Sequence, residues 1–151
     1  MRFDLYDNSR LNFVELNCTG TNNQYVKCAP ESRYVDSVVF NLFTECFEKA
    51  NSLYEYYGPT RFNARYIVPL RYQLLTYLTK IEKIGSADEF SEFFGAKVLG
   101  KEFFDALADL DSHWTDNWKA YHENLVALNK QLLDFIDFCI DEDRILWVLG
   151  Y

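Results

Sequence analysis

One repeated spacing constrains this chain more than any other feature. Large apolar and aromatic residues follow one another in alternating steps of four and three, at Trp114, Trp118, Tyr121, Leu125, Leu128, Leu132, Phe135 and Cys139. This spacing keeps one stripe of a long helix turned toward another helix. It predicts a helical core element that is capped by Asp111 or Ser112 and ends near Ile140.

Four further segments also have helical spacing. They are two long segments and two short ones, at 32–57, 60–84, 86–94 and 101–110. In the second long segment, Pro69 predicts either a kink or a fresh helix start, because proline lacks the amide hydrogen that a helix interior needs. In the third segment, Ser86 and Glu89 have the spacing of a capping box.

The ends of the chain have a different texture. Residues 1–31 contain short apolar runs separated by turn residues, which favours a small antiparallel β meander or an ordered irregular arm. The apolar segment at 145–149 is expected to dock on the helices. We therefore predict a mainly α fold, an antiparallel bundle of three long and two short helices, with residues 1–31 as an arm and 32–151 as the bundle.

Length and composition fit one folded domain. With 151 residues, of which 49% are hydrophobic, the chain is long enough to bury a core without disulfides or metals. Acidic residues near the start interrupt any secretory signal, and no run is apolar enough for a membrane span, so we expect a soluble cytoplasmic protein. In that compartment the four cysteines, Cys18, Cys28, Cys46 and Cys139, are expected to be reduced thiols.

Charge is distributed unevenly along the chain. The net formal charge is −8, yet residues 1–84 have a balance of +1, whereas residues 85–151 have a balance of −9. Proteins that bind nucleic acid or anionic membranes derive affinity from cationic side chains. The acidic half therefore argues against both as direct partners and favours a basic protein as the partner.

The densest group of acids lies where the long helix is expected to end. It comprises Asp134, Asp137, Asp141, Glu142 and Asp143. One interpretation is structural, namely that Asp141 caps a new turn whose start accommodates the two acids after it. The other is functional, because the first three have the spacing i, i+3 and i+7 and would present carboxylates on one helix face.

Tyrosines provide a second indication of a binding surface. Tyr54, Tyr56 and Tyr57 cannot all turn inward on one helix, and Tyr66 and Tyr72 also lie off the main apolar stripe of their segment. Exposed tyrosines beside carboxylates are typical of protein interfaces, where rigid rings anchor and charge steers. Surface tyrosines without a function remain the alternative.

A basic group close to Pro69 offers a different interpretation. Arg61 and Arg65 are four residues apart, and Arg71 follows beyond the proline, so the three arginines are candidates for an anion-binding site. Their alternative role is to pair with the acids of the C-terminal half.

No catalytic or metal-binding pattern is intact. The segment at 95–102 matches a phosphate loop through Lys101 but has Glu102 where a serine or threonine must hold magnesium. His113 and His122 point to opposite sides of a helix and lack ligand spacing. The triplet Asp111-Ser112-His113 is explained by helix capping. We therefore expect no metal and no cofactor.

These observations favour a small acidic, non-enzymatic protein that occludes a basic partner surface. Immunity proteins, antitoxins and phage-encoded inhibitors that imitate nucleic acid have this character, and their partners are basic toxins, nucleases or nucleic-acid-binding proteins. Two alternatives stay open. One is a ligand-binding or enzymatic bundle with an anion site at the arginines, and the other is the subunit of a homo-oligomer whose long stripe meets its own copy.

Overall fold

A computed structural model describes residues 1–7 and 12–150, and half of the chain is helical. Four strands form one sheet: β1 (Phe13–Gly20), β2 (Arg33–Asp36), β3 (Pro59–Phe62) and β4 (Ile145–Gly150). The helices within these residues are α1 (Ser37–Phe40), α2 (Thr44–Ala50), α3 (Ala64–Ile81), α4 (Ala87–Gly95), α5 (Gly100–Leu110) and α6 (Trp118–Asp141).

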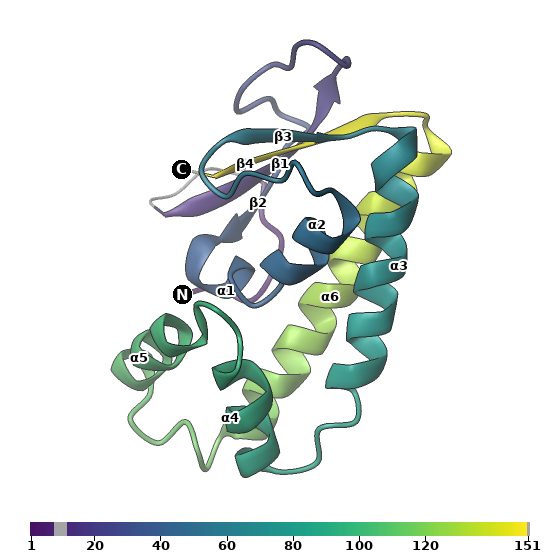
Figure 1. The fold of residues 1–151 in the computed structure, drawn as a ribbon. Coiled ribbons are helices and arrows are strands. Elements are labelled where there is room, and N and C mark those ends of the chain that lie inside the picture. The colour runs from purple at the N-terminus through teal and green to yellow at the C-terminus, as the bar shows by residue number, and fades with distance from the viewer. Residues whose placement is uncertain (8–11, 151) are drawn as a thin grey trace.

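The sheet has the order β2-β1-β4-β3, and every neighbouring pair is antiparallel. The last strand in the sequence, β4, therefore lies inside the sheet, between β1 and β3. Figure 1 shows the sheet at one end of the molecule, with α1 and α2 against one of its faces and α3 and α6 side by side, leading away from it. The short helices α4 and α5 lie at the far end of this pair.

The other face of the sheet is covered by the β1–β2 connection, residues 21–32. The carboxylate of Glu15 on β1 is fully buried, and its hydrogen bonds hold this connection against the sheet. Its Oε1 accepts hydrogen bonds from the Ser32 hydroxyl at 2.7 Å, the Cys28 amide at 2.9 Å and the Asn17 side chain at 2.8 Å. The Trp147 indole also donates to the Thr21 carbonyl at 2.9 Å. These bonds compensate for removing a carboxylate from water.

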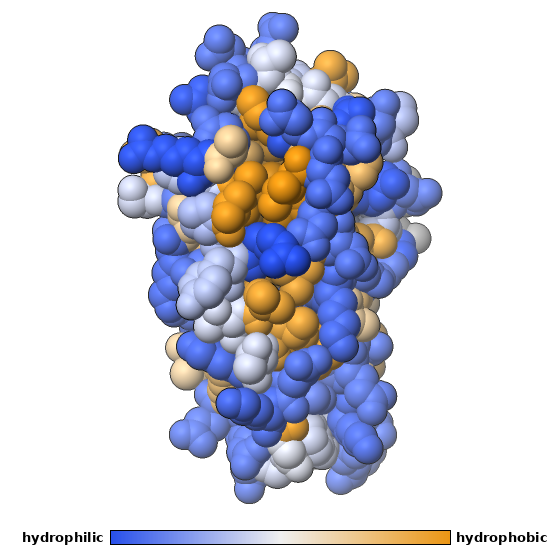
Figure 2. Space-filling view, turned by 90° about the vertical axis from the view of Figure 1, so that its right-hand side faces the viewer, coloured by the Kyte–Doolittle hydropathy of each residue, from blue (hydrophilic) through white to orange (hydrophobic). Residues whose placement is uncertain are grey.

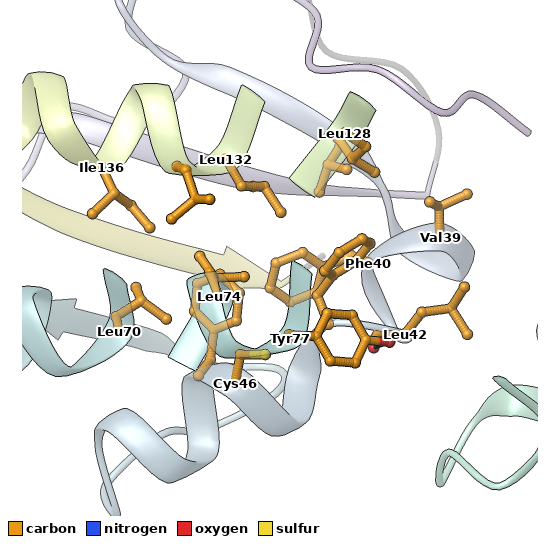
Figure 3. Close-up of a cluster of buried hydrophobic side chains, with 14 of the residues drawn as sticks. Val39, Phe40, Leu42, Cys46, Leu70, Leu74, Tyr77, Leu128, Leu132 and Ile136 are labelled. Carbon is orange, nitrogen blue, oxygen red and sulfur yellow. Dashed lines mark hydrogen bonds between the residues drawn. The ribbon is translucent and has the colours of Figure 1, made fainter. Parts of the chain in front are cut away.

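The core lies where the inner face of the sheet meets α1, α2, α3 and α6. Figure 3 shows apolar side chains from the two long helices pointing toward those of α1 and α2, among them Leu74, Leu132 and Phe40. Phe40 is completely buried, and truncation of such a ring to alanine typically costs about 3–5 kcal/mol. The predicted stripe from Trp118 to Cys139 lies in α6 and faces this core, and its members are buried or half-buried, whereas its first predicted member, Trp114, lies in the turn before the helix.

Helices α4 and α5 close the distant end of the α3–α6 pair with aromatic side chains. Phe90 packs near Phe94, Phe104, Trp114 and Trp118, with ring centroids 4.9–6.2 Å apart. The predicted capping box is confirmed, because the Ser86 hydroxyl accepts from the Glu89 amide at 3.2 Å and the Glu89 carboxylate accepts from the Gly85 amide at 2.7 Å. Both short helices lie within one residue of their predicted bounds.

The predicted helix at 32–57 is wrong. Residues 33–36 pair with β1, and Ser32, at the start of the predicted helix, donates its hydroxyl to Glu15. Asp36 caps α1 by accepting from the Val38 amide. The side chain of Asn51 accepts from the Leu53 amide at 3.0 Å, and this local turn ends α2 well before Gly58.

The predicted helix at 60–84 starts too early, because residues 59–62 pair with β4 as strand β3. Asn63 then caps α3, its side chain accepting from the Arg65 amide at 3.2 Å. Pro69 lies inside α3, which continues on both sides of it, so the alternative of a fresh helix start there is wrong.

The long C-terminal helix begins later than predicted, at Trp118 instead of 112. The Asp111 carboxylate accepts from the His113 amide at 2.8 Å and from the Asn117 side chain at 2.8 Å, and so holds a turn instead of a helix start. The helix ends at Asp141, close to the predicted end. The apolar segment after it is not a docked tail but β4.

These differences change the fold class. The chain is mainly helical, as predicted, but it is a mixed α/β structure and not a pure bundle. Of the β meander expected within residues 1–31, strand β1 is present, but its partner β2 lies in the segment that was predicted to be helical. The two predicted parts, an arm at 1–31 and a bundle at 32–151, share one sheet, because β1 of the first part pairs with β2 and β4 of the second.

Candidate partner-binding face

The outer side of the α3–α6 pair exposes apolar side chains. We call it the α3–α6 face and define it by Val68, Tyr72 and Leu75 of α3 and Asp134, Phe138 and Asp141 of α6. The three α3 residues have the spacing i, i+4 and i+7, so they form one stripe. Exposed fractions are 54%, 65% and 44% for these three residues and 44% for Phe138. Figure 2 shows apolar side chains gathering on this side in two patches with a hydrophilic group between them.

A bidentate ion pair crosses the two helices within this face. Arg71 donates from Nε to Asp137 at 2.5 Å and from a terminal nitrogen at 3.2 Å. The hydrogen bond to Asp137 raises the pKa of Arg71, and the charge of Asp141 raises it further. Toward the other end of the pair, Lys130 lies 3.2 Å from Glu82. Arg71 and Glu82 from the α3 side are therefore paired with Asp137 and Lys130 of α6.

The remaining acids of the predicted cluster are exposed. Asp134, Asp141, Glu142 and Asp143 form no ion pair among the residues that the structure describes. Asp143 has φ 52°, a left-handed conformation that turns the chain from α6 toward β4. Asp137 differs from the other four, because Arg71 neutralises it. The structure thus keeps four of the five predicted carboxylates available at the surface.

The three candidate arginines do not converge. Arg61, on β3, donates to the Asn22 carbonyl of the β1–β2 connection. The guanidinium of Arg65 lies 5.4 Å from the ring centroid of Tyr66. Arg71 is engaged by Asp137, the role that the sequence offered as the alternative to anion binding. An anion site built from these three side chains finds no support in their placement.

The candidate tyrosines lie away from the acids. Tyr54 packs on Phe62 and Phe47 at the core boundary. Tyr56 is half-buried and donates its hydroxyl to Asn41, whereas Tyr57 is 82% exposed. Their loop touches the end of β4, since a Cβ on Gly150 would lie 2.1 Å from the Tyr56 carbonyl. The acids flank the opposite end of that strand, so the two predicted groups do not share a surface.

The two histidines contact different groups. His113 is exposed beside Asp116, and the Nε2 of His122 lies 2.7 Å from the Ile81 carbonyl. Within residues 1–7 and 12–150, no three His, Cys, Asp or Glu side chains are arranged to hold a metal ion. The four cysteines are free; Cys18, Cys46 and Cys139 are buried, and Cys28 is exposed.

Val68, Leu75 and Phe138 of this face were not predicted from the sequence. Of the three exposed α3 residues that define this face, only Tyr72 was predicted to lie off the inner stripe of the helix. Val68 and Leu75 lie on the same outer stripe, and the spacing of four and three residues around Tyr72 is the sequence signal for it. Phe138 carries no such signal, because its exposure depends on how α6 rotates against α3.

Comparison with protein-family models, curated proteins and solved structures gives no match to this chain. Each helix within the described residues is too short or too polar to cross a lipid bilayer.

Proposed function

We propose that this chain is a non-enzymatic binding protein that occludes a basic, amphipathic surface of another protein with its α3–α6 face. One observation carries the proposal: a stripe of exposed apolar side chains lies beside carboxylates that have no ion pair among the described residues. Partners of this chemistry include basic toxins, nucleases and nucleic-acid-binding proteins.

The apolar stripe would provide the affinity. Val68, Tyr72 and Leu75 expose between 44% and 65% of their surfaces, and contacts of this kind contribute about 25 cal/mol for each Å² of apolar area buried. Tyrosine is also enriched among the residues that dominate binding energy, because its rigid ring loses little conformational freedom. A partner with complementary apolar residues would cover this stripe.

The acids would provide steering and specificity. Asp134 and Asp141 flank the stripe, and the net charge of the whole chain is −8. Negative charge around an apolar patch accelerates encounter with a cationic partner and disfavours acidic competitors. The Arg71–Asp137 pair in the middle of the face holds the two helices in register, and in this proposal it is a positioning element instead of a contact for the partner.

The matched variants Val68→Glu and Val98→Glu test this proposal. Both replace an exposed valine by the same acid, but Val98 is 96% exposed on the α4–α5 connector, outside the face. A tagged wild-type chain would isolate partners from the cells that make it, and the affinity of each purified partner would then be measured. We expect Val68→Glu to weaken binding at least tenfold and Val98→Glu to leave it unchanged.

Charge is tested separately. Asp134→Asn with Asp141→Asn should slow association, and raising the salt concentration should weaken the wild-type complex more than that of the double variant. A complex that tolerates Val68→Glu, or one that is insensitive to salt, would contradict the proposal. A concentration-dependent mass of the isolated chain that Val68→Glu abolishes would instead identify a second copy as the occupant.

A further inference from the structure

Three lysines from different parts of the chain meet at a pocket on the other flank of α3. Lys49 of α2, Lys80 of α3 and Lys97 of the α4–α5 connector line a cavity of about 90 Å³. Its other lining groups include the rings of Tyr77 and Phe93 and the polar side chains of Gln73 and Thr76. The volume is several times that needed for one water molecule, so a small polyatomic group fits.

The pocket has positive charge in a strongly acidic protein. Its lining contains one carboxylate, Glu45, whose two oxygens accept from Lys49 Nζ at 2.5 Å and from Lys97 Nζ at 2.9 Å. These two lysines lower the pKa of Glu45 to about 2, so the carboxylate is ionised at neutral pH. With Lys80 added, the ionised groups in the lining have a formal charge of +2.

The ammonium of Lys97 is held in place. Its side chain is only 17% exposed, and Nζ lies 4.8 Å from the ring centroid of Phe93 and 5.1 Å from that of Tyr77. Cation–π contacts of this kind orient the amine before any ligand arrives. Lys80 is exposed and forms no ion pair with any residue in the described part of the chain, so its charge is available.

A second pocket adjoins the first. It has a volume of about 470 Å³ and shares Glu45 and Lys97 with the first pocket. Tyr56, Tyr57 and Val98 contribute apolar surface to its walls, and Glu48 contributes a second carboxylate. Pockets that bind small organic molecules fall in this size range and combine apolar walls with a few placed polar groups. A ligand that reaches both pockets would have an anionic group next to an apolar body.

We propose that the lysine pocket binds the phosphate group of a small organic phosphate whose apolar body lies against Tyr57 and Val98. A phosphate monoester carries a charge of about −1.5 to −2 at pH 7, which complements the +2 of the pocket. Lysine ammonium groups bind phosphate as point charges. This site is independent of the α3–α6 face, so either proposal can fail without the other.

Phenyl phosphate and inorganic phosphate are suitable probes, titrated by calorimetry at constant ionic strength. Two variants should move affinity in opposite directions. Lys80→Gln removes an available charge and should weaken phenyl phosphate binding about tenfold. Glu45→Gln removes the competing carboxylate and should strengthen binding. Lys119→Gln is the matched control, because Lys119 is an exposed lysine of α6 outside the pocket, and it should leave affinity within about twofold of the wild type.

The outcomes separate the two halves of the proposal. Binding of phenyl phosphate that Lys80→Gln weakens and Lys119→Gln preserves supports the lysine pocket. Phenyl phosphate binding no tighter than inorganic phosphate, and unaffected by Tyr57→Ala, would overturn the placement of the apolar body. Equal affinity of the wild type and Lys80→Gln, or no heat of binding for either probe, would overturn the site as a whole.

Discussion

Asn129 of α6 is a polar side chain in an apolar environment, and replacing it with leucine should stabilise the protein. It is completely buried, and neither its amide nitrogen nor its amide oxygen has a hydrogen-bond partner among the described residues. The neighbouring inward positions of α6, including Leu128, Leu132 and Leu133, are apolar and buried. Leucine is similar in size to asparagine and leaves no polar atom unsatisfied.

The magnitude follows from the cost of an unpaired amide. Leaving a buried polar group unsatisfied costs about 1–3 kcal/mol, and Asn129→Leu removes that penalty. The free energy of unfolding should therefore rise by about 1–3 kcal/mol. For a chain of this length, each kcal/mol raises the melting temperature by about 2–4 °C, so a gain of roughly 2–12 °C is expected.

Urea unfolding followed by circular dichroism measures this change, with Asn124→Leu as the control. Asn124 is an exposed residue of the same helix, and the same substitution there should alter stability by no more than about 0.5 kcal/mol. If Asn129→Leu lowered the free energy of unfolding by more than that margin, the amide would have to be paired in solution. That result would contradict the prediction that Asn129 is unpaired.

Two further outcomes follow from the ion pairs and the thiols. Because Lys49 and Lys97 lower the pKa of Glu45 from its usual 4.5 to about 2, its ion pairs stabilise the fold fully above about pH 5 and lose this effect as the pH falls toward 2. The stability difference between the wild type and Glu45→Gln should therefore shrink over that interval in urea titrations. At pH 7 the difference in the free energy of unfolding should be about 1 kcal/mol or less, since the Glu45 carboxylate is 45% exposed. A difference that does not change with pH would contradict the role of Glu45. With a thiol reagent, the exposed Cys28 should react quickly in the folded protein while three thiols react only after unfolding; fast labelling of more than one thiol would argue against the packing of the core.

Helices stabilised by their own spacing could be predicted from sequence. The stripe from Trp118 to Cys139 and the capping box at Ser86 and Glu89 are local patterns, and the structure confirms both. Their physical basis lies within a few residues, so no knowledge of distant partners is required.

The strands could not be predicted in the same way. Val35, Val39, Leu42 and Cys46 are all buried, and their spacing suits a helix, yet the backbone changes from strand to helix between the first two. That change depends on the pairing of β2 with β1, and no local sequence pattern indicates that these two segments pair. The run at 145–149 was recognised as apolar, but a short apolar run does not distinguish a buried strand from a docked tail.

The same limit applies to the surfaces. The carboxylates near the end of α6 were identified from composition, but the ion pair that neutralises Asp137 arises only when α3 packs against α6. Lys49, Lys80 and Lys97 belong to three different elements and share no sequence pattern. Tertiary packing alone creates their pocket.

The position of β4 has a consequence for biosynthesis. A strand between β1 and β3 is needed to join the two halves of the sheet, and of the described helices and strands it is the last to leave the ribosome. The apolar faces of β1 and of the helices therefore stay uncovered in the nascent polypeptide until residue 150 emerges. During that interval it would be a natural client of chaperones.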